Sequence, residues 1–385
     1  MSSDPRATRA ATEISRINAF FPIMTLLGNS MAASRPFEGK TVAISAHLTT
    51  LTGALIRELA LGGGTWIVCS VNHATTDHGV VAMLRSHGIT VYTLGNREDA
   101  YRQALDHKPH LIADVGADIT STLIRERPDL IDHIQGAVEV TRSGISVLRQ
   151  LEDLPLGVIN INDGSLKPAI ENRHGVGEGL WQSVQHLTGM HLSGRRVGVI
   201  GYGPVGKGVA AYARAAGANV EVVEPNSVRR LIAHYDGFPT PNLEGCLKRV
   251  GIAVTCTGRP KSITVDMLAS ARNGLVLINA GHGDDEIDVA GIQAHATSGD
   301  EVSDHVVRYS LENGPTVALL AKGHPLNIVT NSGSPEPVLL HFALLGLTLE
   351  WLASNPIGPG EHPIPEGLEE RAATFALHAL GSAHG

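Results

Sequence analysis

Aromatic residues and charge are both scarce in this chain of 385 residues. Only 4% of the residues are Phe, Trp or Tyr, 18% are charged, and the formal net charge is −8. A chain with no excess of Lys and Arg lacks the basic surface that attracts nucleic acids and anionic membranes. The most apolar late segment, residues 337–353, contains His341 and Glu350 and is too short and too polar to span a bilayer. We therefore expect neither a nucleic-acid nor a membrane partner.

Cysteine is also rare, with three residues, Cys69, Cys246 and Cys256, and no Cys-x-x-Cys pair. Such isolated cysteines are typical of buried free thiols in a reducing compartment, and no spacing of His, Cys or acidic residues indicates a metal site. The first ten residues, MSSDPRATRA, lack the apolar core of a signal peptide. We expect a cytoplasmic protein and no metal.

Glycine, by contrast, is abundant, with 43 residues set among alternating strand-like and helix-like segments. A polar start and one helix over residues 13–30 are predicted first. The alternation that follows predicts parallel βαβ units, in which ligands bind at the carboxyl ends of the strands. In the first half of the chain those ends fall at residues 46–49, 71–73, 114–118 and 138–141.

The segment at residues 195–224, RRVGVIGYGPVGKGVAAYARAAGANVEVVE, carries the clearest motif. An apolar strand leads into a Gly-x-Gly-x-x-Gly turn, and a helix of small residues and a second strand follow. Gly201 permits the tight turn, Gly203 lets the backbone approach a pyrophosphate, and Gly206 lets the helix pack closely on the strand. Glu224, at the end of the second strand, is placed to bind ribose hydroxyls and to repel a 2′-phosphate. The sequence therefore predicts a site for NAD rather than NADP.

The order of segments predicts an α/β protein of two Rossmann-like, doubly wound parallel-sheet domains with a cleft and a hinge between them. A connector, INDGSLKPAIENRHGVGEGLW, leads from the first units into the glycine-rich turn. The closing helices have no sheet of their own, so we expect them to pack on the first domain. We assign residues 1–178 and 333–385 to a substrate-binding domain, and residues 179–332 to the NAD-binding domain.

Five further motifs accompany this turn. SAHLTTLTGALIREL and INDGSLKPAIENRHG precede it, and TCTGRPKSI, INAGHGDDEID and GHPLNIVTNS follow it. Together they resemble the S-adenosylhomocysteine hydrolase family over nearly the whole chain, from about residue 20 to residue 381. The resemblance implies a tightly bound NAD that is regenerated in each turnover, and a small nucleoside as substrate.

The chemistry that the resemblance implies proceeds through a transient ketone. In that family the 3′-hydroxyl of a nucleoside is oxidised, and the ketone acidifies the C4′ proton. Loss of this proton expels the 5′ substituent, after which water adds and the ketone is reduced. Because the C5′ bond breaks only while a carbonyl stands at C3′, the protein must supply bases for the hydroxyl and for C4′–H, and an acid for the leaving group.

The resemblance also implies roles for individual residues. Lys167 and Asn172 match the family's catalytic lysine and asparagine, and Glu171 stands where the family has an aspartate. His47 and His282 match two histidines expected near C5′, where a side chain that titrates near neutral pH suits proton transfer. The expected cofactor-binding residues are Gly201, Gly203, Pro204, Val205, Gly206, Glu224, Arg229, Thr141, Arg142, Ser143, Thr257, Gly258, Asn279 and Asn331.

Three positions of the expected substrate site depart from the family pattern. Leu51 replaces a glutamate at the purine edge, Val115 replaces a catalytic aspartate, and Val140 replaces a glutamate that binds the ribose 2′-hydroxyl. Each change removes a charged hydrogen bond worth about 1.5–3 kcal/mol and leaves a polar group of the same nucleoside unpaired. Thr49 and His324 complete the expected substrate-binding set. The departures favour a changed substrate.

We therefore predict a divergent lyase or dehydratase of specialised nucleoside metabolism that leaves a 4′,5′-unsaturated nucleoside. A genuine S-adenosylhomocysteine hydrolase and a catalytically silent NAD-binding regulator are the alternatives. A plain 2-hydroxy-acid dehydrogenase would share the glycine-rich turn but would have no use for the other motifs. We expect a homo-oligomer, either a dimer or a tetramer.

Overall fold

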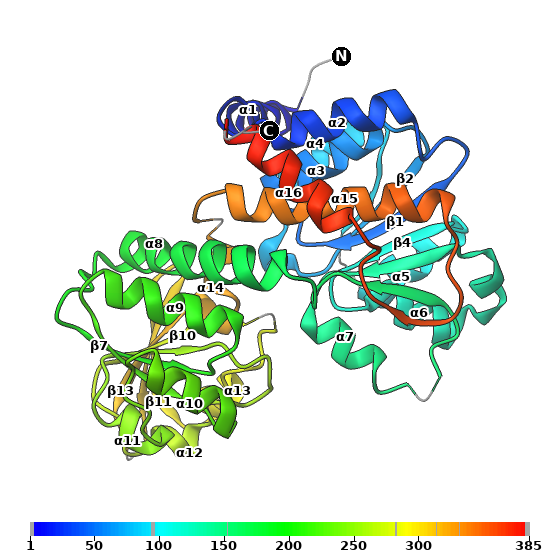
Figure 1. The fold of residues 1–385 in the computed structure, drawn as a ribbon. Coiled ribbons are helices and arrows are strands. Elements are labelled where there is room, and N and C mark those ends of the chain that lie inside the picture. The colour runs from blue at the N-terminus through cyan, green and yellow to red at the C-terminus, as the bar shows by residue number, and fades with distance from the viewer. Residues whose placement is uncertain are drawn as a thin grey trace. The chain divides into compact units, whose positions relative to one another are not determined.

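The structure is a computed structural model that describes residues 4–93, 97–151, 153–281, 283–312, 314–330 and 332–381. The chain divides into two compact units, each with its own sheet (Figure 1). Unit 1 consists of Met1–Lys167 and Pro335–Gly385, and unit 2 of Pro168–Ser334. The chain thus passes from unit 1 to unit 2 after Lys167, within the connector and before the expected boundary at residue 178. It returns to unit 1 at Pro335, close to the expected boundary at residue 332.

Unit 1 is built on a sheet whose described strands are all parallel, in the order β14-β6-β5-β4-β1-β2-β3. The strands are β1 (Thr41–Ala46), β2 (Thr65–Ser70), β3 (Thr90–Tyr92), β4 (Leu111–Asp114), β5 (Gly136–Glu139), β6 (Gly157–Asn160) and β14 (Gly360–His362). The helices are α1 (Pro5–Phe20), α2 (Ile23–Ser34), α3 (Thr50–Ala60), η1 (His73–Thr75), α4 (His78–Ser86), α5 (Arg97–Asp106), α6 (Asp118–Glu126), η2 (Pro128–His133), α7 (Arg142–Leu148), α15 (Glu336–Ser354) and α16 (Leu368–Ala379).

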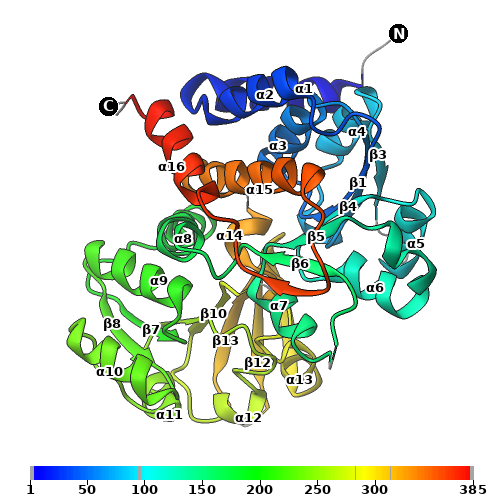
Figure 2. The same cartoon turned by 45° about the vertical axis from the view of Figure 1, so that its right-hand side comes forward.

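Helices cover both faces of this sheet, as Figures 1 and 2 show. Apolar residues of α5, α6 and α7 pack with strand residues such as Ala43, Ile67 and Ile112 in one core cluster. On the other face, α15 packs against α2, α3, β4 and β5, and α1 packs against α4. Alternate residues of each strand therefore point into two apolar layers, which is why the strands are apolar throughout rather than alternating with polar residues.

The N-terminal segment differs from the expected single helix over residues 13–30. The structure has two helices, α1 and α2, separated at Phe21 and Pro22. Proline cannot donate a hydrogen bond to the preceding turn, and its ring disfavours a helical residue before it, so one helix ends and another begins there. Asp4 caps α1 by accepting a hydrogen bond from the Arg6 N–H at 2.9 Å.

Helix α15 is the core helix of unit 1. Among the described residues it is the one helix long and apolar enough to cross a membrane by length and composition, but 67% of its most apolar window is buried inside the protein. The helix contacts α2, α3, β4 and β5, and its buried side chains include many leucines. The tertiary packing of unit 1 thus accounts for its apolar character.

The strand β14 was not expected from the sequence. Residues Gly360–His362 pair with Gly157–Ile159 of β6 and extend the sheet beyond it. Such a short strand has too few residues to show an apolar pattern, and only its pairing partner makes it a strand. The closing segment therefore contributes both a core helix and an edge strand to unit 1.

Unit 2 has its own mixed sheet in the order β11-β12-β13-β10-β9-β7-β8, parallel except for the pairs that β12 makes with β11 and β13. The strands are β7 (Arg196–Ile200), β8 (Asn219–Val223), β9 (Ile252–Thr255), β10 (Leu275–Asn279), β11 (Ala296–Ser303), β12 (Val306–Leu311) and β13 (Thr316–Leu320). The helices are α8 (Val176–Thr188), α9 (Pro204–Ala215), α10 (Ser227–Tyr235), α11 (Leu243–Leu247), α12 (Val265–Leu268), α13 (Val289–Ala294), η4 (Ala321–Gly323) and α14 (Leu326–Val329). The predicted class of two Rossmann-like α/β sheets is confirmed.

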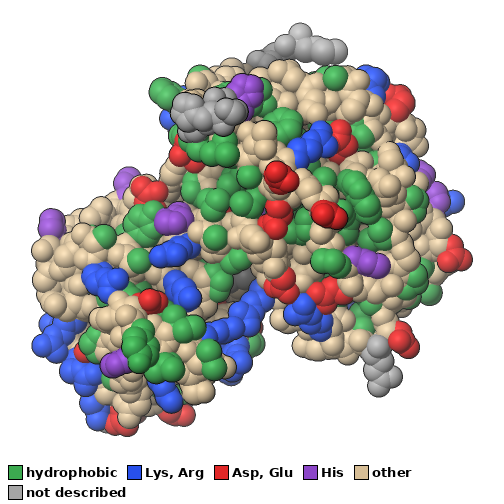
Figure 3. Space-filling model, viewed as in Figure 1, with side chains coloured by type: hydrophobic (Ala, Val, Ile, Leu, Met, Phe, Trp, Pro, Cys, Tyr) green, Lys and Arg blue, Asp and Glu red, His purple; other side chains and the backbone are tan. Residues whose placement is uncertain are grey.

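Helix α10 leaves an apolar face uncovered within the described residues. Its fully buried side chain is Ala233, whereas Val228, Leu231 and Tyr235 are 66%, 57% and 83% exposed. Figure 3 shows hydrophobic side chains on the surface of unit 2 in the region where α10 lies. These exposed apolar side chains lie three and four residues apart, on one face of the helix.

Candidate active site

The glycine-rich turn of unit 2 joins β7 to α9. Gly201 has a φ of +101°, and a Cβ there would lie 2.7 Å from the Cys256 carbonyl oxygen. A Cβ on Gly206 would collide with the carbonyl oxygen of Gly201, whereas a Cβ on Gly203 would meet nothing within 4 Å. Two glycines are therefore required by the fold, and the third leaves open space at the N-terminus of α9. That space suits a pyrophosphate, which backbone N–H groups bind.

Pro204 and Val205 form the first turn of α9, after Gly203 at the N-cap. Proline suits this position because its missing N–H would have had no partner inside the helix. The remaining free N–H groups of this turn, together with the positive end of the helix dipole, are those that an anion meets.

Glu224, directly after β8, is 6% exposed. Its carboxylate accepts hydrogen bonds from the backbone N–H groups of Tyr202 at 2.7 Å and Asn226 at 2.9 Å. The acid thus connects the glycine-rich turn to the start of α10. Arg229 lies in the first turn of α10, where its N–H is held by the Asn226 side chain at 3.0 Å.

A second buried acid, Glu286, organises the loop after β9. It is 1% exposed and accepts the Thr257 N–H at 2.9 Å, the Thr257 hydroxyl at 2.8 Å and the Gly258 N–H at 2.7 Å. Two residues predicted to bind the cofactor are therefore held in place by Glu286. Glu286 was not predicted as a site residue, since it is the last of three consecutive acids in the sequence. The signal is the apolar Ile287 next to it, since a following core residue favours burial.

Asn279, which was predicted to bind the cofactor, lies at the end of β10. Its side chain is fully buried, and its amide donates to the carbonyl oxygens of Gly283 at 2.5 Å and Gly323 at 2.8 Å. Its side-chain oxygen accepts the Gly281 N–H at 2.7 Å. Both amide hydrogens are thus used within the protein, and Asn279 holds the loop after β10 to the segment at Gly323.

In unit 1, the predicted substrate residues lie at the carboxyl ends of neighbouring strands. His47 follows β1, Val115 follows β4 and Val140 follows β5. The order β5-β4-β1 places these ends side by side. Thr49 caps α3, its hydroxyl accepting the Thr52 N–H at 3.4 Å, and Leu51 lies in the first turn of that helix.

Two buried carboxylates lie directly before the two valines. Asp114 accepts the Ser45 hydroxyl at 2.6 Å, the Ile119 N–H at 3.1 Å, and the N–H and hydroxyl of Thr120 at 2.7 and 2.6 Å. Burial raises the pKa of this carboxyl above its ordinary value. All four acceptor positions of a carboxylate are thus occupied by groups of the protein.

Glu139 is the register partner of Asp114 and is 1% exposed. It accepts the Gly116 and Ala117 N–H groups at 3.1 and 2.7 Å, and the N–H and hydroxyl of Thr141 at 2.6 and 2.7 Å. Burial is the larger cause and the charge of Asp114 the second, and together they raise the pKa of Glu139 to about 8. Glu139 was not predicted as a site residue, yet it holds the loops that carry both valines.

Three of the expected cofactor-binding residues, Thr141, Arg142 and Ser143, lie at the start of α7 in unit 1. Thr141 caps the helix by accepting the Gly144 N–H at 3.0 Å, and its hydroxyl lies 3.0 Å from that of Ser143. Arg142 is exposed. Thr141 therefore has a structural role as the partner of Glu139 and as a helix cap.

The connector forms a π-helix, η3 (Lys167–Gly175), across the division between the units. It carries Lys167, which is 7% exposed, together with Glu171 and Asn172. In a π-helix, whose hydrogen bonds join residues five apart, positions 167, 171 and 172 fall on one face, and single π-helical turns occur frequently at functional sites. The sequence motif was recognised, but a helix at this segment was not.

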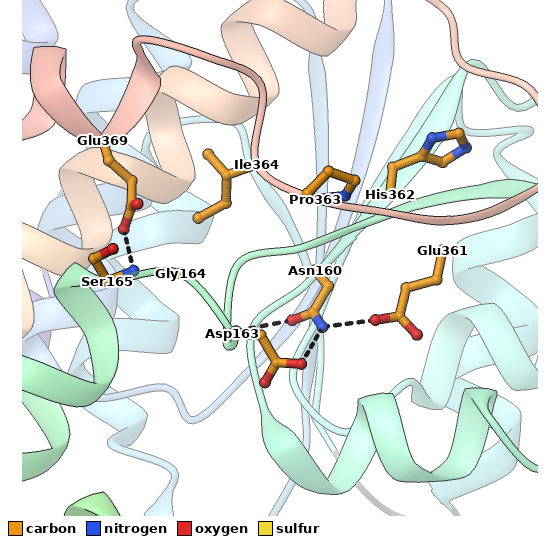
Figure 4. Close-up of a pocket in the computed structure, with 9 residues that line it drawn as sticks. All are labelled: Asn160, Asp163, Gly164, Ser165, Glu361, His362, Pro363, Ile364 and Glu369. Atoms are coloured by element: carbon orange, nitrogen blue, oxygen red, sulfur yellow. Dashed lines mark hydrogen bonds between the residues drawn. The ribbon is translucent and has the colours of Figure 1, made fainter.

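A cavity of about 410 Å³ lies beside the start of the connector in unit 1 (Figure 4). Asn160 donates to Asp163 at 2.9 Å and to Glu361 at 2.8 Å, and Arg149 pairs with both acids. Glu369 accepts the N–H groups of Ser165 at 2.6 Å and of Leu166 at 2.9 Å, directly before Lys167. The start of α16 therefore fixes the backbone that leads to the expected catalytic lysine.

His324 lies in unit 2, with its side chain 28% exposed and its Nδ1 atom 3.5 Å from a carboxylate oxygen of Asp284. The predicted residues His282 and Asn331 lie outside the described residues. Among the residues that are described, no group of three or more His, Cys, Asp or Glu is gathered as a metal site would require.

The sequence matches two family descriptions. Residues 7–128 match "S-adenosyl-L-homocysteine hydrolase", and residues 172–333 match its NAD-binding domain. The chain is 32% identical to adenosylhomocysteinase of Thermotoga maritima over 380 residues, covering 96% of this chain and 94% of the relative. The chain belongs to the S-adenosyl-L-homocysteine hydrolase family.

Other members of the family differ in their named substrates. A Gloeobacter violaceus adenosylhomocysteinase is 33% identical, with 94% of this chain and 87% of the relative covered. An S-inosyl-L-homocysteine hydrolase of Methanopyrus kandleri is 32% identical, with 94% and 88% covered. Among solved structures, the dipicolinate synthase A chain of Bacillus subtilis shares 14% identity at a TM-score of 0.46, over 82% of this chain and 97% of that chain.

As a member of the S-adenosyl-L-homocysteine hydrolase family, the chain binds NAD through unit 2. The structure fits this cofactor in two places. The open space at Gly203 leaves room for a pyrophosphate at the start of α9, and Glu224 stands at the end of the neighbouring strand β8.

Proposed function

We propose that this chain is an NAD-dependent enzyme that oxidises a nucleoside transiently at C3′, removes the C4′ proton and eliminates the 5′ substituent, leaving a 4′,5′-unsaturated nucleoside. The observation that carries the proposal is the set of aliphatic residues at the strand ends of unit 1. Val115 and Val140 follow two adjacent strands, and Leu51 lies in the helix that begins after a third. The resemblance implies carboxylates at all three positions.

The remaining acids at this edge do not compensate for the loss. Asp114 and Glu139 precede the two valines, but four donors of the protein occupy each carboxylate. A carboxylate has about four acceptor positions, so neither acid can also bind a ribose hydroxyl strongly. A substrate without the polar groups that those family carboxylates bind is therefore favoured.

Lys167, Asn172 and His47 of the family's catalytic set are nevertheless present, with Glu171 in place of an aspartate. Bound NAD supplies a hydride acceptor and later returns the hydride. Lys167, in a buried position on the π-helix, is suited to take the proton of the 3′-hydroxyl, and Glu171 lies four residues further along the same helix. His47 is suited to exchange a proton with the 5′ oxygen as it leaves. The C4′ proton passes to a base of the site and one proton is given to the leaving 5′ oxygen, so that with a hydroxyl as leaving group the net change is the loss of one water.

A second candidate is an ordinary hydrolase that releases homocysteine from S-adenosylhomocysteine. The relatives named adenosylhomocysteinase, at about a third identity over nearly the whole chain, favour it. In that reaction water adds back to the unsaturated intermediate before the ketone is reduced, so the two candidates share their first steps.

The test compares products from the purified holoenzyme by mass spectrometry. Adenosine and other nucleosides with a free 5′-hydroxyl are incubated in deuterated water, with S-adenosylhomocysteine in parallel. A product lighter by one water supports the lyase, and homocysteine release supports the hydrolase. Deuterium at C4′ of recovered substrate reports the shared oxidation and deprotonation, and Lys167→Met should abolish it. Holoenzyme that gives none of these signals with any nucleoside would overturn both candidates.

The triple variant Leu51→Glu, Val115→Asp and Val140→Glu restores the family carboxylates. If the aliphatic residues set the substrate, this variant should gain at least tenfold in homocysteine release relative to the unaltered chain, because three charged hydrogen bonds return. An equal rate in both proteins would show that these positions do not control specificity.

We further propose a homo-oligomer, for which the exposed face of α10 offers a contact surface.

A further inference from the structure

A hydroxyl that no sequence motif pointed to lies against His47. Helix η1 (His73–Thr75) follows β2, the parallel neighbour of β1. Because both strands end at the same edge, the turn after β2 comes beside His47, the residue that follows β1. The Thr75 hydroxyl oxygen lies 2.7 Å from the His47 Nδ1 atom, a short hydrogen bond.

The direction of this hydrogen bond follows from counting hydrogens. Thr75 has one hydroxyl hydrogen and two possible partners, His47 Nδ1 and the Asn72 carbonyl oxygen, which lies at 3.1 Å. The carbonyl oxygen can only accept. If the hydroxyl donates to Asn72, then Nδ1–H of His47 donates to Thr75 and both bonds form. If the hydroxyl donates to His47 instead, only one of them forms.

The position of Thr75 is set by its own turn. The residue is 5% exposed, and its N–H donates to the Asn72 carbonyl oxygen at 3.3 Å. The Asn72 side chain accepts the Ala74 N–H at 2.8 Å, which fixes the start of the turn. A buried hydroxyl in a fixed turn is a preorganised acceptor for a histidine N–H.

We infer that Thr75 is a positioning residue that holds neutral His47 in the tautomer with hydrogen on Nδ1. Nε2 is then the basic nitrogen that can take or return a proton. This fixes which ring atom of His47 exchanges protons, in the way that the partner of one ring nitrogen generally sets the state of the other. The inference rests on the proposed function only for the consequence in catalysis, since the tautomer itself is a property of the folded chain.

The first test measures the tautomer directly. The chain is labelled with ¹⁵N-histidine, and its ring nitrogens are observed by long-range ¹H–¹⁵N correlation at a pH where the histidines are neutral. The His47 signals are assigned by their disappearance in His47→Gln. We expect a protonated Nδ1 and an unprotonated Nε2 in the unaltered chain and in Thr75→Ser. A hydrogen on Nε2 in the unaltered chain would overturn the inference.

The second test separates positioning from folding. Thr75→Val keeps the shape of the side chain but removes the acceptor, and Thr75→Ser keeps the hydroxyl. We expect the Val variant to lose the Nδ1–H tautomer and about tenfold in kcat with little change in KM, and the Ser variant to retain both. Equal values for the two variants would contradict the inference. A third outcome separates the two proposals. If the Ser variant keeps the Nδ1–H tautomer and the Val variant loses it, but His47→Gln leaves turnover unchanged, the inference stands and the proposed catalytic role of His47 fails.

Discussion

At the scale of single residues, buried carboxylates organise both units. Glu139 holds two loops and a helix cap in unit 1, Glu286 holds the loop after β9, and Glu224 holds the glycine-rich turn. Each carboxylate accepts backbone N–H groups that would otherwise have no partner in a buried loop. An unpaired buried polar group costs about 1–3 kcal/mol. These acids therefore stabilise the loops that form the expected binding surfaces.

Glu139 should make the stability of unit 1 depend on pH. Its pKa is about 8 in the folded chain, against an ordinary value of 4.5, so the folded state holds the proton to a higher pH than the unfolded chain does. The stabilisation is complete below pH 4.5 and is lost as the pH rises through about 8. Urea unfolding between these values should show a free energy of unfolding that falls with pH.

Glu139→Gln should flatten this dependence, because the amide does not titrate. The exposed Glu366→Gln serves as the matched control and should leave the slope as it is. If Glu139→Gln and the unaltered chain show the same slope from acid to neutral pH, the buried carboxyl is not the group responsible.

At the scale of elements, the turn between β7 and α9 shows how one motif serves two purposes. Gly201 and Gly206 are required because the chain has no room for a Cβ, whereas Gly203 faces open space. A sequence motif cannot separate these purposes, since all three positions are simply glycine. The packing around each one does so.

The turn therefore predicts opposite outcomes for two similar variants. Gly206→Ala should destabilise the chain by about 2 kcal/mol or more, because its Cβ would collide with the Gly201 carbonyl oxygen. Gly203→Ala should leave the melting temperature of the cofactor-free chain unchanged but weaken NAD binding by about tenfold, because its Cβ fills the space expected for the pyrophosphate. Thermal melting and NAD titration of both variants make the comparison. Equal loss of NAD binding in two equally stable variants would contradict it.

At the scale of the whole molecule, the chain leaves unit 1, completes unit 2 and returns. Unit 2 is continuous in sequence and has its own core clusters around its sheet. Unit 1 depends on the returning segment, since α15 supplies core residues and β14 extends the sheet. The two units should therefore respond differently when the chain is cut near residue 334.

A fragment of residues 168–334 should fold by itself and bind NAD, because its strands, covering helices and glycine-rich turn are all retained. In a fragment of residues 1–334, unit 1 should be unfolded, because the apolar surface that α15 covers in the full chain would face water. Circular dichroism and NAD titration of both fragments test this. A 168–334 fragment that melts without cooperativity, or a stable unit 1 without α15, would contradict the division.

Much of this protein follows from local sequence. Alternating apolar segments predicted the parallel sheets, and the turn at residues 201–206 predicted the dinucleotide site, because each depends on residues close together in the chain. The fold class and NAD were thereby predicted correctly. The single helix expected over residues 13–30 was wrong because Pro22 ends one helix and begins the next.

Tertiary structure alone decided the contacts between distant segments. β14 is a strand only because Gly157–Ile159 pairs with it, and Asn279 is a loop-holding residue only because Gly283 and Gly323 come to it. Thr75 meets His47, 28 residues away, because two parallel strands end at one edge. Local sequence sets which residues can form strands, turns and caps. Which side chains meet is set by packing, because burial and hydrogen bonding are satisfied across the whole chain at once.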